Sequence, residues 1–399
     1  MASPAQSARA LFRNHFGSLP VHVVAAPGRV EILGNHTDYN GGLVLAAAID
    51  RSLAMAVSPR QDGRVEIVSD RYAGAVSFLA DDATHDPAST WTGYVKGVLA
   101  SLGRRGIPPR GFNAAVAADL PAGAGLSSSA ALTTATLLAY RQMFPFSLQS
   151  GVAAPEQDRN GRVPSPSATE RLEFARLCQH AESEFAGVNC GLLDPLTILS
   201  GREGCALELD FLHLTVTPVP LPPEAVLMLA PTGVQHSLAD SAYNELRAAC
   251  EEAAGVLGVG VLRTADMGRL DAAKARLSPR AAAVAEHVIA ENARVARATR
   301  ALQEGADGEF GQLMFQSHAS SRDLLGNSCP ELDAMVELAQ MDSRCLGARL
   351  TGGGFGGATM HLVKAEEAIG YKRWLTEQFY ERTGRTTEPF ICRAVAGAG

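Results

Sequence analysis

Glycine is concentrated in three segments of this chain, and each segment adjoins residues that are expected to form strands. The segments cover residues 28–42, 121–131 and 347–357 and hold a good part of the 39 glycines in the sequence. Glycine lacks a Cβ atom, so it is favoured where a backbone turns sharply or approaches a ligand or another loop closely. We therefore expect several loops of the chain to pack tightly against a ligand or against another loop.

The composition is that of a globular protein with more than one domain. A length of 399 residues, with 46 % apolar and 19 % charged residues, suggests two domains or three. A net charge of −7 provides no basic surface for nucleic acid. The seven cysteines are scattered singly, and neither a signal peptide nor a membrane-length apolar run is visible. We expect a soluble cytoplasmic protein with small-molecule partners and with neither nucleic acid nor membrane as a partner; a monomer and a weak homo-oligomer both remain open.

Short apolar runs separated by turn residues predict a mixed or antiparallel sheet in the first part of the chain. Helical spacing dominates the second part, which closes as strand, glycine loop, strand, helix and strand. This change places a boundary near residues 200–215, which gives an N-terminal domain of 1–205 and a C-terminal domain of 206–399. The expected strands include 21–26 (ending at Pro27-Gly28), 43–49, 53–57 and 112–118, and the expected helices include 91–102, 130–141 and 170–185.

The segment 121–131 lies between an expected strand and an expected helix. Gly123 and Gly125 permit close backbone approach, and the helix that begins in Ser127, Ser128 and Ser129 offers unpaired N–H groups and a positive dipole end. Such a segment can cradle a phosphate, while its hydroxyls can cap the helix, bind Mg²⁺ or donate to phosphate oxygens. It lacks the P-loop pattern. An ordinary capped helix after a flexible turn is equally compatible with the residues.

A second cluster of hydrogen-bonding side chains falls in one expected loop between two strands. It contains Arg29, Asn35, His36 and Asp38. A polyhydroxylated ligand needs such a set, because each hydroxyl must find a partner that offsets its desolvation. A solvated loop in which His36 is a bystander explains the pattern as well.

The third glycine segment and two carboxylates complete the candidates. Closely flanking strands, and Phe355 within the segment, favour a packed turn at 347–357 over a flexible linker. Glu182 lies on an expected helix. Asp194 precedes Pro195, so it is either a helix N-cap or a carboxylate held near the cradle to accept a hydroxyl proton.

In this order, the three segments closely resemble those of galactokinases, within the GHMP family of small-molecule kinases. Residues 28–42 resemble the galactokinase signature, 123–131 the GHMP ATP loop and 347–357 its third motif, and the similarity runs from about residue 12 to the C-terminus. The resemblance implies an α+β fold of two lobes, with an N-terminal ribosomal-S5-like lobe, a C-terminal ferredoxin-like lobe and the active site in the cleft between them.

The resemblance also implies roles for individual residues. Asp194 is expected beside the C1 hydroxyl of the sugar as the catalytic carboxylate, where it removes the proton or only orients the hydroxyl, and Arg29 is expected beside it and the transferring phosphoryl group. ATP and Mg²⁺ are the implied cofactors, with Ser128 and Glu182 as metal ligands. The implied sugar contacts are Asn35, His36, Asp38, Gly191 and Tyr243, and the implied ATP contacts are Trp91 and Tyr94 at the adenine and Gly123, Gly125, Leu126, Ser127, Ser128 and Ser129 at the phosphates.

Four positions depart from the pattern of the family. Asn35 replaces the usual Glu of a sugar-contacting position near C6, Pro195 replaces a Gln, and Leu325 and Asn327 stand where Tyr and Val are common. None belongs to the expected phosphoryl-transfer group, so they concern the identity of the sugar. The expected activity is ATP-dependent phosphorylation of galactose at C1. A 1-kinase for a related hexose or galactose derivative, and a sugar sensor without turnover, are the alternatives.

Overall fold

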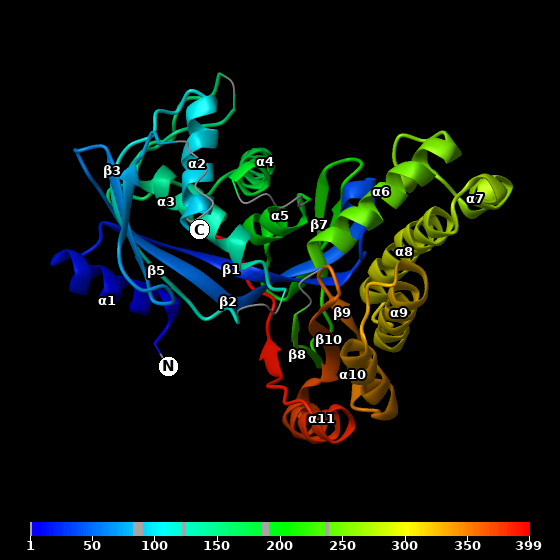
Figure 1. Ribbon diagram of the computed structural model, residues 1–399. Coiled ribbons are helices and arrows are strands. Elements are labelled where there is room, and N and C mark those ends of the chain that lie inside the picture. Colours follow the sequence, from blue (N-terminus) through cyan, green and yellow to red (C-terminus); the bar gives the residue numbers. More distant parts are fainter. Residues whose placement is uncertain (1, 83–90, 122–124, 150, 186–190, 236–238) are drawn as a thin grey trace.

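Two β-sheets organise the structure, one in each lobe of a computed structural model that describes residues 2–82, 91–121, 125–149, 151–185, 191–235 and 239–399 (Figure 1). The first, seven-stranded sheet is built from the N-terminal half of the chain. Its lobe contains α1 (Pro4–Phe16), β1 (His22–Leu33), the 3-10 helix η1 (Asp38–Asn40), β2 (Leu43–Pro59), β3 (Arg64–Ser69), β4 (Val76–Leu79), α2 (Thr92–Arg104), β5 (Phe112–Ala118), α3 (Ser128–Met143), α4 (Ala168–Phe185), α5 (Leu193–Ser200), β6 (Cys205–Asp210) and β7 (Thr215–Pro220).

The second, four-stranded sheet and a group of long helices form the other lobe. This α+β arrangement confirms the fold class expected from the sequence. The lobe contains β8 (Ala225–Gln235), α6 (Ala239–Leu257), α7 (Met267–Ala273), α8 (Pro279–Gln303), α9 (Asp307–Ser320), the π-turn η4 (Ser321–Leu325), α10 (Pro330–Met341), β9 (Cys345–Thr351), β10 (Gly356–Lys364), α11 (Ala368–Thr383) and β11 (Phe390–Cys392), with short 3-10 turns at Leu262–Thr264, Lys274–Arg276 and Ala365–Glu367.

Strand β2 is the central strand of the first sheet. It pairs with β1 along one edge, and on its other edge its first residues pair with β6 and its last residues with β5. The two separate strands expected at 43–49 and 53–57 are therefore one strand, and that prediction was wrong. The intervening Asp50 does not end the strand, because its carboxylate and N–H both bond to the backbone of Arg393 in the C-terminal tail.

Strand β1 also runs further than the sequence indicates. It was expected to end at Pro27-Gly28, but it continues to Leu33 with a bulge between Pro27 and Gly28. Proline is tolerated here because β1 pairs with a single neighbour, so the missing N–H removes no bond from an inner ladder. As a result Arg29 projects from a strand, while Asn35, His36 and Asp38 follow in the loop.

The second sheet has the order β11-β8-β10-β9 with antiparallel pairing throughout. This is the ferredoxin-like order that the resemblance implies. Alternate residues of β8 face opposite cores: Met228 packs with α10 and α11, whereas Leu229 joins the main core of the first lobe. The two lobes therefore share apolar side chains across their junction.

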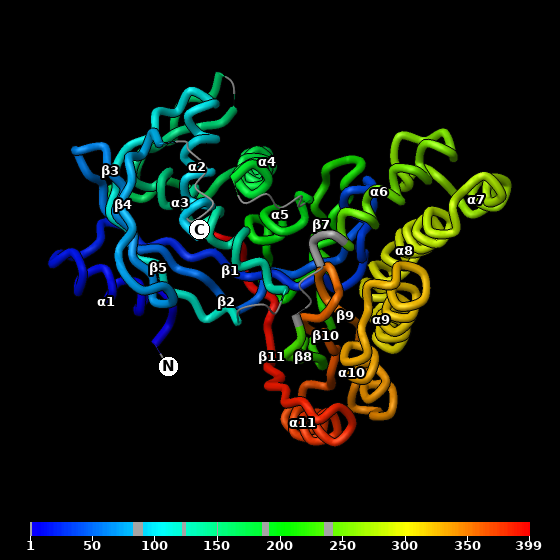
Figure 2. Tube along the Cα trace, viewed as in Figure 1, coloured from blue at the N-terminus to red at the C-terminus, as the bar shows by residue number. Residues whose placement is uncertain are grey.

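The sheets change later in the chain than the sequence suggests. Strands β6 and β7 extend the first sheet beyond the expected boundary at 205/206, and the second sheet begins only at β8. We propose to draw the boundary between Pro220 and Ala225. The C-terminal tail returns from β11 to the first lobe, where Val395 bonds to Ala48 (Figure 2).

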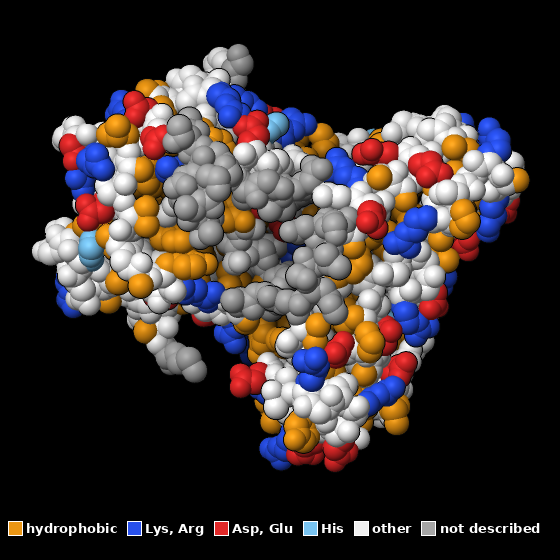
Figure 3. All heavy atoms as spheres, in the orientation of Figure 1, with side chains coloured by type: hydrophobic (Ala, Val, Ile, Leu, Met, Phe, Trp, Pro, Cys, Tyr) orange, Lys and Arg blue, Asp and Glu red, His pale blue; other side chains and the backbone are white. Residues whose placement is uncertain are grey.

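Three features of the described residues concern possible partners: the surface charge, the length of the helices and the state of the cysteines. Side chains of both charges are interspersed over the face shown in Figure 3. Within the described ranges, no helix combines the length and the apolar character that crossing a bilayer requires. The six cysteines that the structure describes are all unpaired.

Helix α9 packs directly on β9 through two glycines, and this contact generates a prediction. A Cβ atom at Gly311 would overlap the carbonyl oxygen of Leu346, and one at Gly347 would overlap the backbone of Gly311. Gly311→Ala should therefore lower the free energy of unfolding, measured by urea titration, by about 2 kcal/mol or more. Gly308→Ala, on the same helix but facing open space, should raise it by up to about 1 kcal/mol. Equal effects of the two variants would contradict this packing.

Candidate functional site

The three glycine segments meet at one place in the structure. A Cβ atom at Gly28 would lie 2.9 Å from the carbonyl oxygen of Leu126, so only glycine lets β1 pass this close to the second segment. Gly125 in turn lies against the third segment, because its ideal Cβ position is 3.6 Å from the carbonyl oxygen of Thr351. The sequence prediction of closely packed loops is confirmed for these residues, and Gly123 lies outside the described ones.

An ion pair between Arg29 and Asp194 lies at this meeting point. The Arg29 Nε and Nη2 atoms are 2.7 and 2.5 Å from Asp194 Oδ1, and Nη1 donates to the carbonyl oxygen of Gly125 at 2.6 Å. The second oxygen, Asp194 Oδ2, accepts a hydrogen bond from the Ser127 hydroxyl at 2.5 Å. Both carboxylate oxygens therefore have a donor, and the guanidinium connects β1, the 121–131 segment and α5. The structure thus brings together three residues that the sequence singled out separately.

Ser127 has an unusual backbone conformation that explains this bond. It occupies the N-cap position of α3 with φ 58° and ψ 49°, in the left-handed region that non-glycine residues seldom adopt. Its hydroxyl faces Asp194 and does not cap the helix, and no other described side chain caps it either. Among the described residues, the first N–H groups of α3 therefore have no capping side chain, and open N–H groups at a helix N-terminus are an arrangement that binds anions.

The helix-capping alternative for Asp194 does not hold. Asp194 lies within α5, whose N-cap is Leu192, and its carboxylate bonds to Arg29 and Ser127. Its position in the first turn of α5 still favours a negative charge. Pro195 follows in the same turn, where a missing N–H costs nothing.

Glu182 on α4 is the second carboxylate beside α3. It is buried, accepts a hydrogen bond from Thr133 at 3.3 Å and contacts the Ser129 hydroxyl. Burial, together with the nearby charge of Asp194, raises the pKa of Glu182 to about 7. Ser128, the first residue of α3, is exposed. A hydroxyl and a carboxylate on adjoining helices, with two like charges near each other, are a donor set that suits a hard divalent cation.

The loop after β1 presents His36 toward the third glycine segment. His36 Nε2 donates to the Gly353 carbonyl oxygen at 3.3 Å, so Nδ1 is the acceptor for the Tyr39 hydroxyl at 2.8 Å. Burial lowers the pKa of His36 to about 4, which keeps the ring neutral near pH 7. The Tyr243 ring of α6 lies 5.1 Å from the His36 ring. The sequence reasoning did not single out Tyr39 as a partner of His36, although it belongs to the same segment.

Asp38 lies beside the predicted sugar-contacting Gly191. A Cβ atom on Gly191 would overlap the Asp38 carboxylate, so the two segments touch. Burial and the nearby charges of Glu31 and Asp194 raise the pKa of Asp38 to about 7, against smaller lowering effects of the Tyr39 N–H and of Arg29. His36, Asp38, Gly191 and Tyr243 therefore surround one region next to Asp194.

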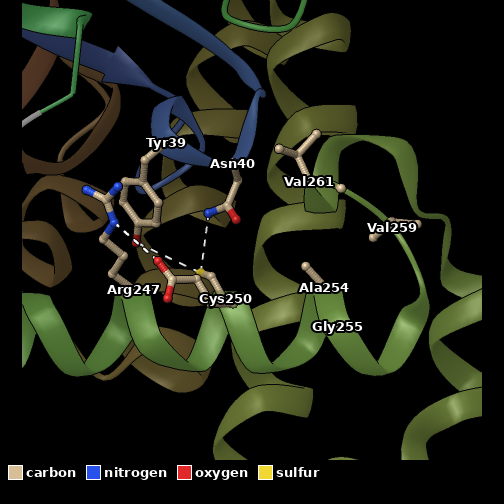
Figure 4. Close-up of a pocket in the computed structure, with 10 residues that line it drawn as sticks. Tyr39, Asn40, Arg247, Cys250, Ala254, Gly255, Val259 and Val261 are labelled. Carbon is tan, nitrogen blue, oxygen red and sulfur yellow. Dashed lines mark hydrogen bonds and ion pairs between the residues drawn. The ribbon is translucent and has the colours of Figure 1, made fainter.

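Helix α6 packs against the loop that follows β1, as Figure 4 shows. The Asn40 amide points to the Cys250 sulfur and donates to it at 3.3 Å, and the Arg247 guanidinium lies 5.5 Å from the centre of the Tyr39 ring. Because Tyr39 bonds to His36, α6 of the second lobe helps to hold the orientation of the imidazole in the first.

Trp91 and Tyr94, the expected adenine contacts, lie at the start of α2. Trp91 stacks on Tyr72 with ring centres 5.3 Å apart and an angle of 6° between the planes. Tyr72 is half exposed, and the sequence reasoning did not identify it because it lies outside every motif.

Asn35 is the predicted site residue whose surroundings differ most from the expectation. It is 1 % exposed, and its amide bonds to Glu31, Gly352, Asn327 and Ser321. These bonds use both N–H groups and both acceptor positions of the amide. The structure therefore offers no unpaired polar atom of Asn35 to a ligand.

The arrangement defines a class of protein. A helix N-terminus open to an anion, a guanidinium–carboxylate pair beside it and a polar region across from both suit phosphoryl transfer to a small hydroxylated molecule. Family models agree: the GHMP kinases N terminal domain matches residues 93–202, the GHMP kinases C terminal matches residues 298–381, and the galactokinase galactose-binding signature matches residues 10–59. The fold is that of a GHMP kinase.

Similarity to individual proteins narrows the class. The galactokinase of Chloroflexus aggregans is 37 % identical over 97 % of this chain and 95 % of its own, and human galactokinase is 37 % identical over 98 % and 95 %. The crystal structure of Lactococcus lactis galactokinase complexed with galactose superposes with a TM-score of 0.88 at 29 % identity, covering 98 % of both chains. This chain belongs to the galactokinase family.

The raised pKa of Asp38 predicts how stability depends on pH. The carboxyl ionises near pH 3.8 in the unfolded chain and near pH 7 in the folded one, so the contribution of Asp38 to the free energy of unfolding falls as the pH rises between these values and levels off above them. Asp38→Asn lacks this slope, so its stability relative to wild type should increase over that interval and then stay constant. Urea titrations from about pH 4 to about pH 8 measure it. Asp271→Asn, at an exposed carboxyl of α7, is the control, and parallel curves for wild type and Asp38→Asn would contradict the assignment.

Proposed function

We propose that this chain transfers the γ-phosphoryl group of ATP to the C1 hydroxyl of galactose, which yields galactose 1-phosphate and ADP. The observation that carries the proposal is the Arg29–Asp194–Ser127 cluster, held between the start of α3 and the loop with His36 and Asp38. The match to the galactose-binding signature supports galactose as the sugar. The protein is proposed to work in the cytoplasm, with reduced cysteines.

The sugar would lie between the β1–β2 loop and α6. Asp38 and His36 offer hydroxyl partners, with Gly191 leaving room beside Asp38 and Tyr243 covering the His36 ring. A neutral imidazole whose Nε2 already donates to Gly353 is held in one orientation. Each of these groups suits a ligand that presents several hydroxyls at once.

The ATP phosphates would lie at the N-terminus of α3. The uncapped N–H groups there and the positive end of the helix dipole favour an anion, and Gly125, with Leu126 behind it, keeps the backbone accessible. Arg29 adds a positive charge on the side of Asp194. Trp91, Tyr94 and the stacked Tyr72 are proposed to border the adenine.

Ser128 and Glu182 fit the Mg²⁺ that the family implies. The fit rests on their oxygen donors and on the proximity of the Glu182 and Asp194 charges, which a cation would compensate. Within the described residues there is no group of three or more acidic, histidine or cysteine side chains that could hold a metal alone. When bound together with ATP, Mg²⁺ would neutralise charge on the phosphates.

Asp194 would orient the C1 hydroxyl and receive its proton. The C1 oxygen then forms a bond to the γ-phosphorus, the bond from that phosphorus to the β-phosphate oxygen breaks, and ADP leaves. Arg29 and Ser127 bond to both oxygens of Asp194 and hold the carboxylate in place, and Arg29 also counters charge on the transferring group. A sugar sensor without turnover would not need this cluster intact.

Substitution of Asp194 tests this chemistry. Asp194→Ala and Asp194→Asn should each lower kcat by about 1,000-fold or more, because the hydroxyl loses its acceptor, while the dissociation constant for ATP changes little. Turnover is measured by ADP release, and nucleotide binding by titration calorimetry. Asp271→Asn should match wild type in both. Near-normal turnover of the Asp194 variants would refute the assignment.

A panel of sugars tests the substrate. ADP release should be fastest with galactose when it is compared with glucose, arabinose, N-acetylgalactosamine and 6-deoxygalactose. Position 35 is expected near C6, and the Asn35 amide is fully bonded within the protein, so kcat/KM for 6-deoxygalactose should stay within about 100-fold of the galactose value, far from the 10⁴-fold penalty of a site built to bond that hydroxyl. No ADP with any sugar, despite sugar-dependent ATP binding, would favour the sensor.

A further inference from the structure

A buried polar cluster lies directly beneath the loop that carries His36 and Asp38. Glu31 of β1 forms an ion pair with Arg349 of β9, with 2.9 Å between Oε1 and Nη1, and the same Oε1 accepts a hydrogen bond from Asn35 Nδ2 at 3.0 Å. Arg349 is 0 % exposed. The pair therefore joins strands of the two lobes with almost no exposure to solvent.

Asn35 connects this ion pair to the second lobe. Its Oδ1 accepts hydrogen bonds from Asn327 Nδ2 at 2.8 Å and from the Ser321 hydroxyl at 3.3 Å, while its Nδ2 also donates to the Gly352 carbonyl oxygen at 2.8 Å. Two of the positions at which the sequence departs from the family pattern, Asn35 and Asn327, are thus bonded to each other. A valine at position 327 would provide no donor.

Asn327 also holds the third glycine segment. Its Nδ2 donates to the Gly353 carbonyl oxygen at 3.1 Å, and its own carbonyl accepts the Phe355 N–H at 2.6 Å. The Gly353 carbonyl is the atom to which His36 Nε2 donates. Asn327 and His36 therefore share an acceptor, so a change in the cluster would reach the imidazole through Gly353.

The charge balance of the cluster permits one carboxylate. Among the described side chains, Glu31 is the one that forms an ion pair with Arg349, and two Arg349 nitrogens, Nε and Nη2, have no partner. Loss of the Glu31 charge would leave a buried guanidinium uncompensated, and a second carboxylate at position 35 would lie next to the first. The Asn35 amide nitrogen is already 3.0 Å from the oxygen that bonds to Arg349, so a glutamate at 35, longer by one methylene, could reach the guanidinium.

We infer that Glu31, Asn35 and Asn327 form one coupled unit that positions the sugar-binding loop, and that Glu31 supplies the single carboxylate that Arg349 requires. The carboxylate that pairs with Arg349 can then be supplied from position 31 or from position 35, provided that only one of the two residues is charged. These are positioning residues, because they act through His36 and Gly353. The statement about sugar rests on the proposed function, whereas the statement about coupling does not.

Exchange of the two side chains tests the inference. Glu31→Asn and Asn35→Glu should each lower the thermal midpoint by several degrees or prevent folding, and should raise the galactose KM about tenfold or more, with a smaller change in the ATP KM. The double variant Glu31→Asn/Asn35→Glu should recover most of both losses. Glu31→Gln, which keeps the shape and removes the charge, should fold and show the same rise in galactose KM.

The control carries the same two substitutions at exposed positions. Glu203→Asn/Asn14→Glu, at two exposed side chains, should behave as wild type and show no coupling between its two sites. Losses in the double exchange variant that equal or exceed the sum of the single losses, failure of that variant to fold, or an unchanged galactose KM in Glu31→Gln would overturn the inference. The thermal midpoints decide the coupling even if the wild-type protein phosphorylates no sugar, so a failure of the proposed function is distinguishable.

Discussion

The ion pair between Arg29 and Asp194 is the interaction on which the site depends. It connects β1 with α5 and, through the Gly125 carbonyl, with the segment that leads into α3. Two backbone features place its surroundings: β1 continues past Pro27 and so carries Arg29, and Ser127 adopts a left-handed conformation in which its hydroxyl bonds to the same carboxylate. Removal of one partner of a partly buried ion pair costs more free energy than formation of the pair contributes, because the remaining charge is left uncompensated. Each partner therefore holds the other in place.

The second lobe completes the site through short contacts with the first. His36 bonds to Gly353, Asn35 bonds to Gly352, and the Tyr243 ring packs on the imidazole. Close backbone approaches beside these contacts, of Gly28 to Leu126 and of Gly354 to Asn327, leave no room for a Cβ atom, and Gly125 has a positive φ. These constraints explain why glycine is concentrated in three segments that are distant in sequence. The shared apolar core under β8 holds the lobes together where these contacts form.

Much of this arrangement was predictable from the sequence. Local pattern identified β5, α3 and α4 closely, because strand alternation and helical spacing depend on neighbouring residues, and the motif residues Arg29, Ser127 and Asp194 do converge. Long-range pairing was not predictable: β2 is continuous through Asp50 because the C-terminal tail bonds to it, and β6 joins the first sheet because β2 is long enough to pair with it. The buried Glu31–Arg349 pair joins residues far apart in the chain; each lies in a glycine segment, but no spacing or residue pattern in the sequence pairs one with the other.

The most direct test of the account is the position of phosphate on the product. Incubation with ATP, Mg²⁺ and galactose, followed by ³¹P and ¹H NMR of the sugar product, reports which oxygen carries the phosphoryl group. Phosphorus should show three-bond coupling to the anomeric proton and to no other sugar proton, because the roles proposed for Asp194 and Arg29 are at the C1 hydroxyl. Phosphate on any other hydroxyl of galactose, or the absence of a phosphorylated sugar, would contradict it.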